Sequence, residues 1–299
     1  FIVTVEQQKE LALSTSSESV GQDALIFEPS GRNTAPCILL SLVTLLEKGY
    51  SDDDIVVIVP SDHVILNTQG FQDTVKTAAE VAARDEVIVT IGIKPNFPHT
   101  GFGYLHKGEE THQDIFNVAE FKEKPDSDTA KSYVKSGEYL WNAGMFVSRI
   151  DTLLEEFKQC SPETYKYFSL LREAGENCEE VYKQIPSNSI DYAVMEKSNR
   201  VKVVPASFDW NDLGSWDALE AVIESKDENT FASCHSHYLS NAKGNIVYAP
   251  GKHVSLVDLN DYIVVSNDQS VVILPKNKSQ DVKKIVEAIK SDESLKSLL

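Results

Sequence analysis

The sequence is poor in cysteine, and the few cysteines it has are scattered. Cys37, Cys160, Cys178 and Cys234 stand far apart, with no C-x-x-C pair. This spacing favours neither a zinc site nor a disulfide framework, and it is typical of proteins from a reducing compartment. We therefore expect a cytoplasmic protein.

Basic residues are also scarce. Lys and Arg total 28 against 46 Asp and Glu, which gives a formal net charge of -18. Because this charge repels phosphate backbones and anionic membranes, we expect neither a nucleic-acid partner nor a membrane partner. An anionic small-molecule substrate would need a local cluster of cations or a metal ion. No apolar run approaches the roughly 20 residues that span a bilayer.

The first residue is Phe1 rather than methionine. Residues 1–5 (FIVTV) have the character of a strand already in progress, without the basic segment or cleavage site of a signal peptide. The expectation is a chain that begins inside a fold, with earlier sequence cut away.

Strands and helices alternate along the first two thirds of the sequence. Residues 55–59 (IVVIV) and 87–93 are apolar runs typical of strands buried on both faces, and residues 71–84 between them carry a helical pattern. Further strands are expected at 115–121 and 201–204. This alternation predicts an α/β layered domain with a mostly parallel sheet. Ligands of such sheets lie at the carboxyl ends of the strands, so the residues that follow each strand are site candidates.

The pattern changes from about residue 231. Short strands separated by turn residues follow one another at a spacing of about 8–10 residues, which predicts a small β-rich appendage similar to a β-solenoid. An amphipathic helix at 280–290 closes the sequence. We place the first domain at residues 1–230 and the β-rich C-terminal domain at 231–299.

A polar run, Glu28–Pro36 (EPSGRNTAP), comes directly before an apolar helix. Asn33 or Thr34 can cap this helix, and Pro36 suits its first turn, where no backbone N–H is needed. A polar loop at a rigid helix start is a candidate binding site for an anion or a polar heterocycle. The alternative is an ordinary capped helix after a turn.

Two aspartates, Asp62 and Asp212, each follow a predicted strand. Mg2+ takes oxygen ligands and is held by one or two carboxylates together with substrate phosphates, so this pair is a candidate metal site. The alternative is that each aspartate only caps a turn or a helix. His63 could approach a ligand, although a single histidine after a strand is more often structural.

Several charged and polar residues could contact a phosphorylated sugar. Arg32, Lys122 and Lys124 are candidate cations for phosphates. Glu123 is expected to point to the side opposite the two lysines that flank it, where it can accept hydrogen bonds from sugar hydroxyls. A solvated charged face is the alternative. The segments WNAG (141–144) and TGFGY (100–104) suit either sugar binding or plain turns.

Seven short segments, in this order, resemble the mannose-1-phosphate guanylyltransferase family of sugar-1-phosphate nucleotidyltransferases. They are residues 28–36, 60–63, 92–104 (GIKPNFPHTGFGY), 121–126 (FKEKPD), 141–146 (WNAGMF), 189–197 (SIDYAVMEK) and 208–216 (FDWNDLGSW). The family couples mannose 1-phosphate to GTP, which releases pyrophosphate and makes GDP-mannose. The resemblance implies a Rossmann-like nucleotidyltransferase domain, a β-solenoid-like tail and dependence on Mg2+.

The resemblance also implies a role for each matching residue. Asp62 and Asp212 match the family's two magnesium carboxylates, and Lys124 matches the lysine that contacts the sugar phosphate; these three form the expected catalytic set. The loop that recognises the guanine nucleotide would comprise Gly31, Arg32, Asn33, Thr34 and Pro36. The sugar would be held by Gly103, Glu123, Asn142, Gly144 and Asp191.

The chemistry needs no general base, because the attacking phosphate oxygen of mannose 1-phosphate is already ionised at neutral pH. Members of the family carry a glycine-rich G-x-G-x-R-L-x-P-type loop that grips the triphosphate, and the sequence contains nothing like it. We therefore expect little or no transferase activity from the chain as given. The alternatives are a nucleotidyltransferase for another sugar 1-phosphate and a non-catalytic regulatory homologue that binds nucleotide sugars. A homodimer is left open.

Overall fold

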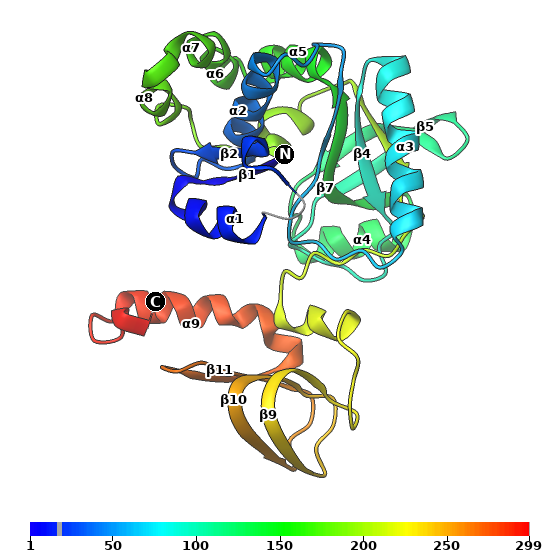
Figure 1. Cartoon of the computed structure of the whole chain (residues 1–299). Helices are drawn as coiled ribbons and strands as arrows, with labels where there is room; N and C mark the ends of the chain where they lie inside the picture. Colours follow the sequence, from blue (N-terminus) through cyan, green and yellow to red (C-terminus); the bar gives the residue numbers. More distant parts are fainter. Residues whose placement is uncertain (17–19, 299) are drawn as a thin grey trace. The chain divides into compact units, whose positions relative to one another are not determined.

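The computed structural model describes residues 1–16 and 20–298, which form two compact units (Figure 1). The first unit comprises Phe1–Pro60 and Asn67–Phe208, and the second comprises Ser61–Leu66 with the chain from Asp209 onward. Among the described helices, none combines the length and the apolar character that crossing a membrane requires.

A six-stranded sheet is the centre of the first unit. Its order is β3 (Ile55–Ile58), β7 (Tyr139–Arg149), β4 (Ile88–Ile93), β8 (Val201–Pro205), β6 (Ile115–Lys122) and β5 (Tyr104–His112). The α/β class is confirmed, but the sheet is mixed: β4 and β8 pair in parallel, whereas β7 and β6 are antiparallel to their neighbours. The expectation of mostly parallel pairing is therefore wrong. β3 and β4 do run in the same direction, but β7 lies between them and opposes both.

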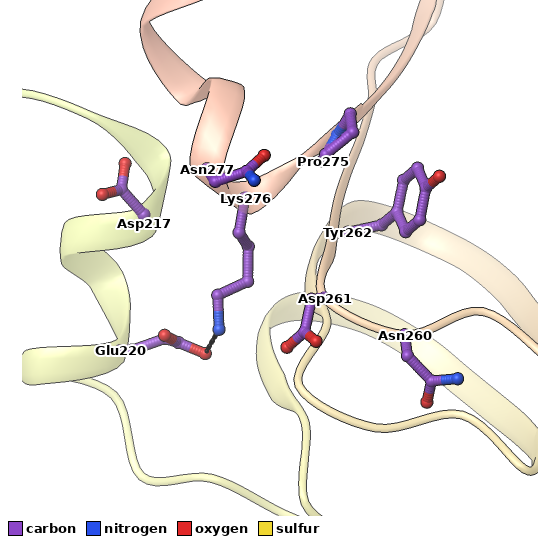
Figure 2. Close-up of a pocket in the computed structure, with 8 residues that line it drawn as sticks. All are labelled: Asp217, Glu220, Asn260, Asp261, Tyr262, Pro275, Lys276 and Asn277. Atoms are coloured by element: carbon purple, nitrogen blue, oxygen red, sulfur yellow. Dashed lines mark hydrogen bonds and ion pairs between the residues drawn. The ribbon is translucent and has the colours of Figure 1, made fainter.

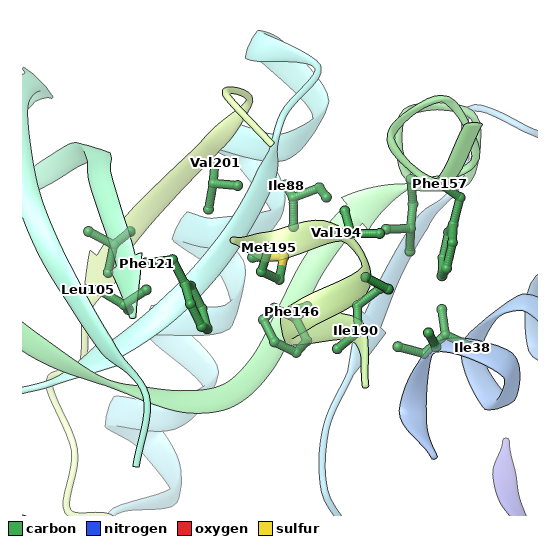
Figure 3. Packing of buried hydrophobic residues seen from close by; sticks show 14 of the residues in the cluster. Ile38, Ile88, Leu105, Phe121, Phe146, Phe157, Ile190, Val194, Met195 and Val201 are labelled. Atoms are coloured by element: carbon green, nitrogen blue, oxygen red, sulfur yellow. The ribbon is translucent and has the colours of Figure 1, made fainter. Parts of the chain in front are cut away.

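Helices cover both faces of this sheet. Successive residues of a strand point to opposite faces, and Ile88 and Val89 accordingly belong to different apolar clusters. The helix on the face of Val89 is α3 (Thr68–Asp85), which lies beside the sheet in Figure 1. Its side chains Ala78 and Val81 belong to the same apolar cluster as Val89. On the face of Ile88, side chains of α2 (Thr34–Glu47) and α5 (Ile150–Cys160) pack with those of the strands and of residues 190–195 in the cluster drawn in Figure 3. A further helix, α4 (Ser127–Ser136), follows β6.

The strand β3 differs from its sequence-based prediction. The apolar run at 55–59 is typical of a strand buried on both faces, yet β3 pairs only with β7 among the described strands. As a result Val57 is 42% exposed. Apolar content alone does not distinguish a central strand from an edge strand.

Smaller elements pack beside α2. Strands β1 (Ile2–Val5) and β2 (Leu25–Glu28) form a two-stranded parallel sheet, and α1 (Lys9–Thr15) follows β1. The short helices α6 (Pro162–Tyr165), α7 (Tyr167–Ala174) and α8 (Cys178–Tyr182) were not predicted. An apolar cluster joins α2 and β2 to α7 and α8, and its buried members are Ile26, Leu39, Leu40, Val43, Tyr167, Leu171, Tyr182 and Ile185.

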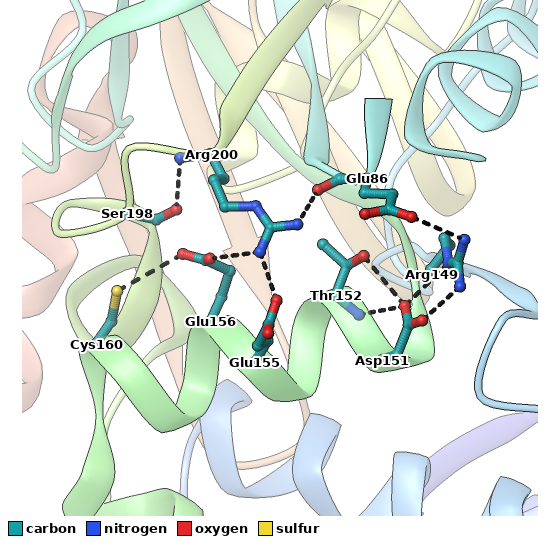
Figure 4. A network of polar contacts seen from close by, with 9 residues as sticks. All are labelled: Glu86, Arg149, Asp151, Thr152, Glu155, Glu156, Cys160, Ser198 and Arg200. Atoms are coloured by element: carbon teal, nitrogen blue, oxygen red, sulfur yellow. Dashed lines mark hydrogen bonds and ion pairs between the residues drawn. The ribbon is translucent and has the colours of Figure 1, made fainter. Parts of the chain in front are cut away.

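A network of charges ties α5 to the end of α3 (Figure 4). Arg200 donates to the backbone carbonyl of Glu86, just after α3, and to the carboxylate of Glu155 at 2.6 Å. Its guanidinium also lies 3.5 Å from Glu156, which is only 2% exposed. Arg200 is therefore the cation that compensates a buried carboxylate.

The second unit confirms the predicted β-rich C-terminal domain. Strands β9 (Thr230–Ser240), β10 (Ile246–Val257) and β11 (Tyr262–Ser266) pair in parallel, as successive coils of a solenoid do, and β12 (Val271–Pro275) adds an antiparallel edge. The helix α9 (Val282–Ser291) follows. Asn229 and Asn245 stack at equivalent positions of neighbouring coils, where their side chains bond to each other and to the backbone.

This unit also contains a polar pocket of about 560 Å³. The ion pair between Lys276 and Glu220, at 2.7 Å, crosses it (Figure 2). The lining residues are Asp217, Glu220, Asn260, Asp261, Tyr262, Pro275, Lys276 and Asn277. None of them belongs to the segments singled out in the sequence.

Candidate functional site

The loop before α2 is held tightly by the protein itself. Asn33 is the cap: its backbone is left-handed, with φ of 69°, and its side-chain oxygen accepts from the Thr34 N–H at 2.8 Å. The Ala35 N–H donates to the carbonyl of Asn188 at 3.1 Å. Since Pro36 has no N–H, the first turn offers no obvious free donors to an anion. Of the two ligand classes expected for this loop, the polar heterocycle is the better match.

Side-chain contacts fix the loop from two further sides. Arg32 donates through Nη1 to the carbonyl of Ile185 at 3.2 Å, and the Ile190 N–H donates to Oγ1 of Thr34 at 2.8 Å. Ile190 directly precedes Asp191. The candidate nucleotide loop and the segment of the candidate sugar residue Asp191 therefore adjoin.

Beneath the loop lies a buried polar pair. Glu28, only 8% exposed, accepts a hydrogen bond from the hydroxyl of Tyr182. Burial, followed by the nearby charge of Glu28, raises the pKa of the Cys37 thiol to about 12. Burial likewise raises the pKa of Tyr182. Both groups are thus protonated at neutral pH, and Cys37 has no nucleophilic character here.

Asn142 is the centre of a second group of candidate residues. Its N–H donates to the carbonyl of Gly103 at 2.8 Å. Its side-chain oxygen accepts from Thr90 at 2.9 Å and from the Gly144 N–H at 3.2 Å. Its side-chain nitrogen donates to Asp191 at 3.1 Å. Thr90 was missed by the sequence reasoning, although a polar residue inside the apolar run 87–93 was a usable signal.

The two glycines of this group are required by geometry. A Cβ on Gly103 would collide with the carboxylate of Glu123 and would come within 3.3 Å of Cβ of Asn142. Gly144 has a φ of +68°, which side chains rarely adopt. The absence of a side chain at Gly103 therefore leaves room for Glu123 and Asn142 to approach, whereas Gly144 provides the left-handed backbone.

The structure corrects the expected directions of Glu123 and Lys124. They do not point to opposite sides: Nζ of Lys124 lies 2.8 Å from Oε1 of Glu123. The strand β6 ends at Lys122, and Lys124 has a left-handed φ of 48°, so the alternation of an extended strand no longer holds. The hydrogen bond to Glu123 raises the pKa of Lys124, and the Lys124 side chain remains 58% exposed.

Asp191 is the carboxylate that burial affects most clearly in this group. Burial, and then the charge of Glu123, raise its pKa to about 6. It begins a π-helix, Asp191–Met195. π-Helical turns are rare and are frequently found at functional sites. The group of Gly103, Glu123, Lys124, Asn142, Gly144 and Asp191 thus forms one cluster, all within the first unit; we call it the sugar-site cluster.

The candidate magnesium residues, Asp62 and Asp212, both lie in the second unit. A backbone bridge between Val64 and Asn211, with N–O distances of 2.8 and 3.1 Å, brings their two segments side by side. His63 lies near both carboxylates. Burial lowers the pKa of His63, while the charges of Asp62 and Asp212 act in the opposite direction.

The chemistry of this pair fits Mg2+. Two carboxylates supply the oxygen ligands that Mg2+ prefers, and Asp212 commits one oxygen to the Gly214 N–H at 3.2 Å. Within the part of the chain that the structure describes, no group of three or more His, Cys, Asp or Glu is arranged to hold a metal. Other ligands would therefore come from water and substrate, which is the usual coordination of Mg2+.

Comparisons with known proteins agree with these observations. The nucleotidyl transferase family model matches residues 1–229, and the MannoseP isomerase/GMP-like beta-helix domain model matches residues 238–289. The chain belongs to the nucleotidyl transferase family. The second match gives independent support for the solenoid-like coils of the C-terminal unit.

Similar proteins carry the name expected from the resemblance. A putative mannose-1-phosphate guanylyltransferase of Vibrio cholerae is 38% identical over 275 residues, covering 90% of this chain and 58% of that protein. The mannose-1-phosphate guanylyltransferase of Escherichia coli is 38% identical over 280 residues, with the same coverages. The resemblance stated from the seven segments is confirmed. This nucleotidyl transferase spans about 58% of the length of these relatives.

Solved structures are similar over most of the chain. A crystal structure described as mannose-1-phosphate geranyltransferase from Thermus thermophilus has a TM-score of 0.86 at 29% identity, covering 96% of this chain and 83% of that one. One described as mannose-6-phosphate isomerase from Helicobacter pylori has a TM-score of 0.62 at 28% identity, covering 71% and 83%.

Proposed function

We propose that this nucleotidyl transferase moves GMP from GTP to mannose 1-phosphate, giving GDP-mannose and pyrophosphate, with Mg2+ as cofactor. The observation that carries the proposal is the sugar-site cluster, in which the amide of Asn142 and the carboxylate of Asp191 bond to each other and the exposed Lys124 pairs with Glu123 beside Gly103. The names of the relatives support mannose 1-phosphate as the acceptor. Glycine, amide and carboxylate groups are suited to sugar hydroxyls, whereas the lysine is suited to a phosphate.

Each residue of the cluster has a distinct task. The carboxylates of Glu123 and Asp191 accept hydrogen bonds from hydroxyls, and Asp191 is mostly ionised at neutral pH because its pKa is about 6. Asn142 is held at its backbone nitrogen and its side-chain oxygen, so its side-chain nitrogen orients Asp191. The Lys124 side chain is more than half exposed, and its ammonium offers its charge to the sugar phosphate.

The reaction needs alignment and charge compensation rather than a proton acceptor. The attacking oxygen of mannose 1-phosphate is already an anion, so no residue has to remove a proton. Asp62 and Asp212 would hold Mg2+, which supplies positive charge to the phosphates of the nucleotide. The loop at 31–36 is proposed to contact the base, since the backbone donors at the helix start, Thr34 and Ala35, are engaged within the protein and Pro36 has none.

Isothermal titration calorimetry on the full chain tests the sugar half of this proposal. Mannose 1-phosphate should bind, and Lys124→Ala should weaken it about tenfold, the cost of one charge-assisted contact. Lys135→Ala is the matched control: Lys135 is an exposed lysine of α4 outside the cluster, so its loss should change affinity little. Equal affinity of the Lys124→Ala variant for mannose 1-phosphate would contradict the assignment.

The choice of nucleotide needs a separate measurement. Pyrophosphate release is compared for GTP, ATP, UTP and dTTP with mannose 1-phosphate, glucose 1-phosphate or fucose 1-phosphate as acceptor. We expect slow turnover, because the sequence lacks the glycine-rich loop that grips the triphosphate, and a preference for GTP and mannose 1-phosphate in the turnover that is measured. Turnover with another pair would make the chain a nucleotidyl transferase for that sugar, and binding of GDP-mannose without any turnover would favour the regulatory homologue.

A further inference from the structure

The indole of Trp210 fixes the hydrogen-bonding state of His63. Its Nε1–H donates to Nδ1 of His63 at 3.0 Å, and the two rings meet edge to face at 5.3 Å and 87°. An indole nitrogen is only a donor, so Nδ1 of His63 must be the acceptor. A neutral imidazole that accepts at Nδ1 carries its hydrogen on Nε2. The geometry therefore defines both the tautomer and the atom that remains available to donate.

The residue that carries this Nε2–H is close in the second unit to the candidate magnesium carboxylates. His63 directly follows Asp62, and Trp210 precedes Asp212 by two residues. The Val64–Asn211 bridge holds these two segments together. Among residues 1–16 and 20–298, nothing accepts a hydrogen bond from Nε2 of His63. One donor of defined tautomer is thus carried by the same two segments that carry Asp62 and Asp212.

We propose that His63 binds a phosphate oxygen of the metal-held ligand through Nε2–H, and that Trp210 is the positioning residue that makes this possible. This inference rests on the proposed function for the presence of a phosphate ligand beside Asp62 and Asp212. A neutral donor is suited to the position, because it contacts an anionic oxygen without repelling a neighbouring Mg2+. The opposite tautomer would direct a lone pair at that oxygen and repel it.

The simpler alternative is that Trp210 and His63 only pack two segments together. Packing depends on the ring contact, whereas the proposal depends on one N–H. Trp210→Phe separates the two, because phenylalanine retains an edge-to-face contact and cannot donate to Nδ1. His63→Gln and His63→Asn form the second matched pair: the amide nitrogen of Gln reaches the place of Nε2, and that of Asn does not.

The tautomer is read by nitrogen NMR on the full chain labelled at its 7 histidines, with the His63 signals assigned from His63→Gln. The wild type should show hydrogen on Nε2 alone, and Trp210→Phe should show a mixture of the two tautomers. An unchanged tautomer in Trp210→Phe would overturn the positioning role. Circular dichroism melting curves of each variant establish that the fold is retained.

Phosphate binding is measured by calorimetry with inorganic pyrophosphate in the presence of Mg2+. His63→Asn should weaken pyrophosphate about tenfold, as expected for the loss of one hydrogen bond to a charged oxygen, and His63→Gln should recover most of the affinity. Titration with Mg2+ alone should be the same for wild type and His63→Asn. Pyrophosphate affinity that does not change in His63→Asn would overturn the proposal.

These outcomes are distinguishable from failure of the proposed function. If mannose 1-phosphate does not bind but pyrophosphate affinity depends on His63, the assignment of mannose 1-phosphate is wrong and the role of His63 in phosphate binding is supported. If mannose 1-phosphate binds and His63→Asn leaves pyrophosphate affinity unchanged, the proposed role of His63 is wrong and the proposed sugar substrate is still supported.

Discussion

Asp191 is the residue of the sugar-site cluster whose ionisation is disfavoured by folding. Burial, and then the charge of Glu123, raise its pKa from 3.8 to about 6. Between these two values the folded chain holds a proton that the unfolded chain has released. The contribution of Asp191 to stability therefore decreases as the pH rises from about 4 to about 6, and the full cost is present above that range.

Replacing this carboxylate by an amide should remove the cost. Asp191→Asn keeps an oxygen that can accept from Asn142 but carries no charge, so at pH 7 it should stabilise the protein by about 1–2 kcal/mol. At pH 4 the difference should vanish. Urea unfolding of both proteins at several pH values measures it, and Asp268→Asn, at an exposed position, is the control. A stability difference that is the same at pH 4 and pH 7 would show that burial does not raise this pKa.

Sequence motifs predicted which residues belong to the sugar-site cluster better than they predicted where the side chains of those residues point. The segments FKEKPD and WNAGMF supplied Glu123, Lys124 and Asn142, and the structure brings these together. The pairing of Glu123 with Lys124 could not be predicted, because it depends on a left-handed φ at Lys124. Glycine is the usual sequence signal for this backbone conformation, and position 124 is a lysine. The bond between Trp210 and His63 joins residues 147 positions apart, and no local pattern reports such a contact.

At the scale of elements, the stacked asparagines are the distinctive feature of the β-rich unit. Asn245 is fully buried and has every polar side-chain atom engaged. Its side-chain nitrogen donates to Asn229 at 2.9 Å and to the carbonyl of Leu259 at 2.7 Å, and its oxygen accepts from the Tyr262 N–H at 2.9 Å. One side chain thus connects three successive coils at their turns.

Truncating this side chain should loosen the coils. In Asn245→Ala the Tyr262 N–H and the Leu259 carbonyl lose their partners inside the protein, which should cost about 2–4 kcal/mol. Hydrogen exchange followed by mass spectrometry should show lost protection in peptides that cover β10 and β11. Asn277→Ala, at an exposed asparagine of the same unit, should leave exchange unchanged. Protection equal to wild type in Asn245→Ala would mean that backbone pairing alone holds the coils.

Periodicity identified most elements but not their partners. The strands at 88–93, 115–122 and 201–205 and the helix at 68–85 occur close to where the apolar patterns place them. The position of β7, antiparallel between β3 and β4, could not be predicted from the sequence pattern. An apolar run shows that a strand is buried, but it does not show which strand lies beside it. The short helices between 162 and 182 were missed because none is long enough to show a clear period.

At the scale of the whole molecule, the two units have separate cores. The apolar clusters around α2, α3, α5 and the six-stranded sheet contain only residues of the first unit. Those around β9, β10, β11 and β12 contain only residues of the second. Because the two sets of clusters share no residue, we expect damage to one core to leave the local stability of the other unchanged.

The Arg200 network offers a perturbation confined to the first unit (Figure 4). Removing the cation leaves the buried carboxylate of Glu156 uncompensated and the Glu86 carbonyl without its donor. Because the Arg200 side chain is itself 33% exposed, we expect Arg200→Leu to cost about 2–3 kcal/mol, less than a fully buried pair would. Glu155→Ala, which removes only the exposed partner, should cost well under about 1 kcal/mol.

Combining Arg200→Leu with Asn245→Ala tests the independence of the two cores. Arg200→Leu should increase hydrogen exchange in peptides of α5 and β8, and Asn245→Ala in peptides of β10 and β11. In the double variant, each of these two sets of peptides should lose the same protection as in the corresponding single variant. The free energies of opening should agree to within about 0.5 kcal/mol, because the two positions share no contact. Lost protection in β10 and β11 caused by Arg200→Leu alone would instead mean that the two units open as one cooperative body.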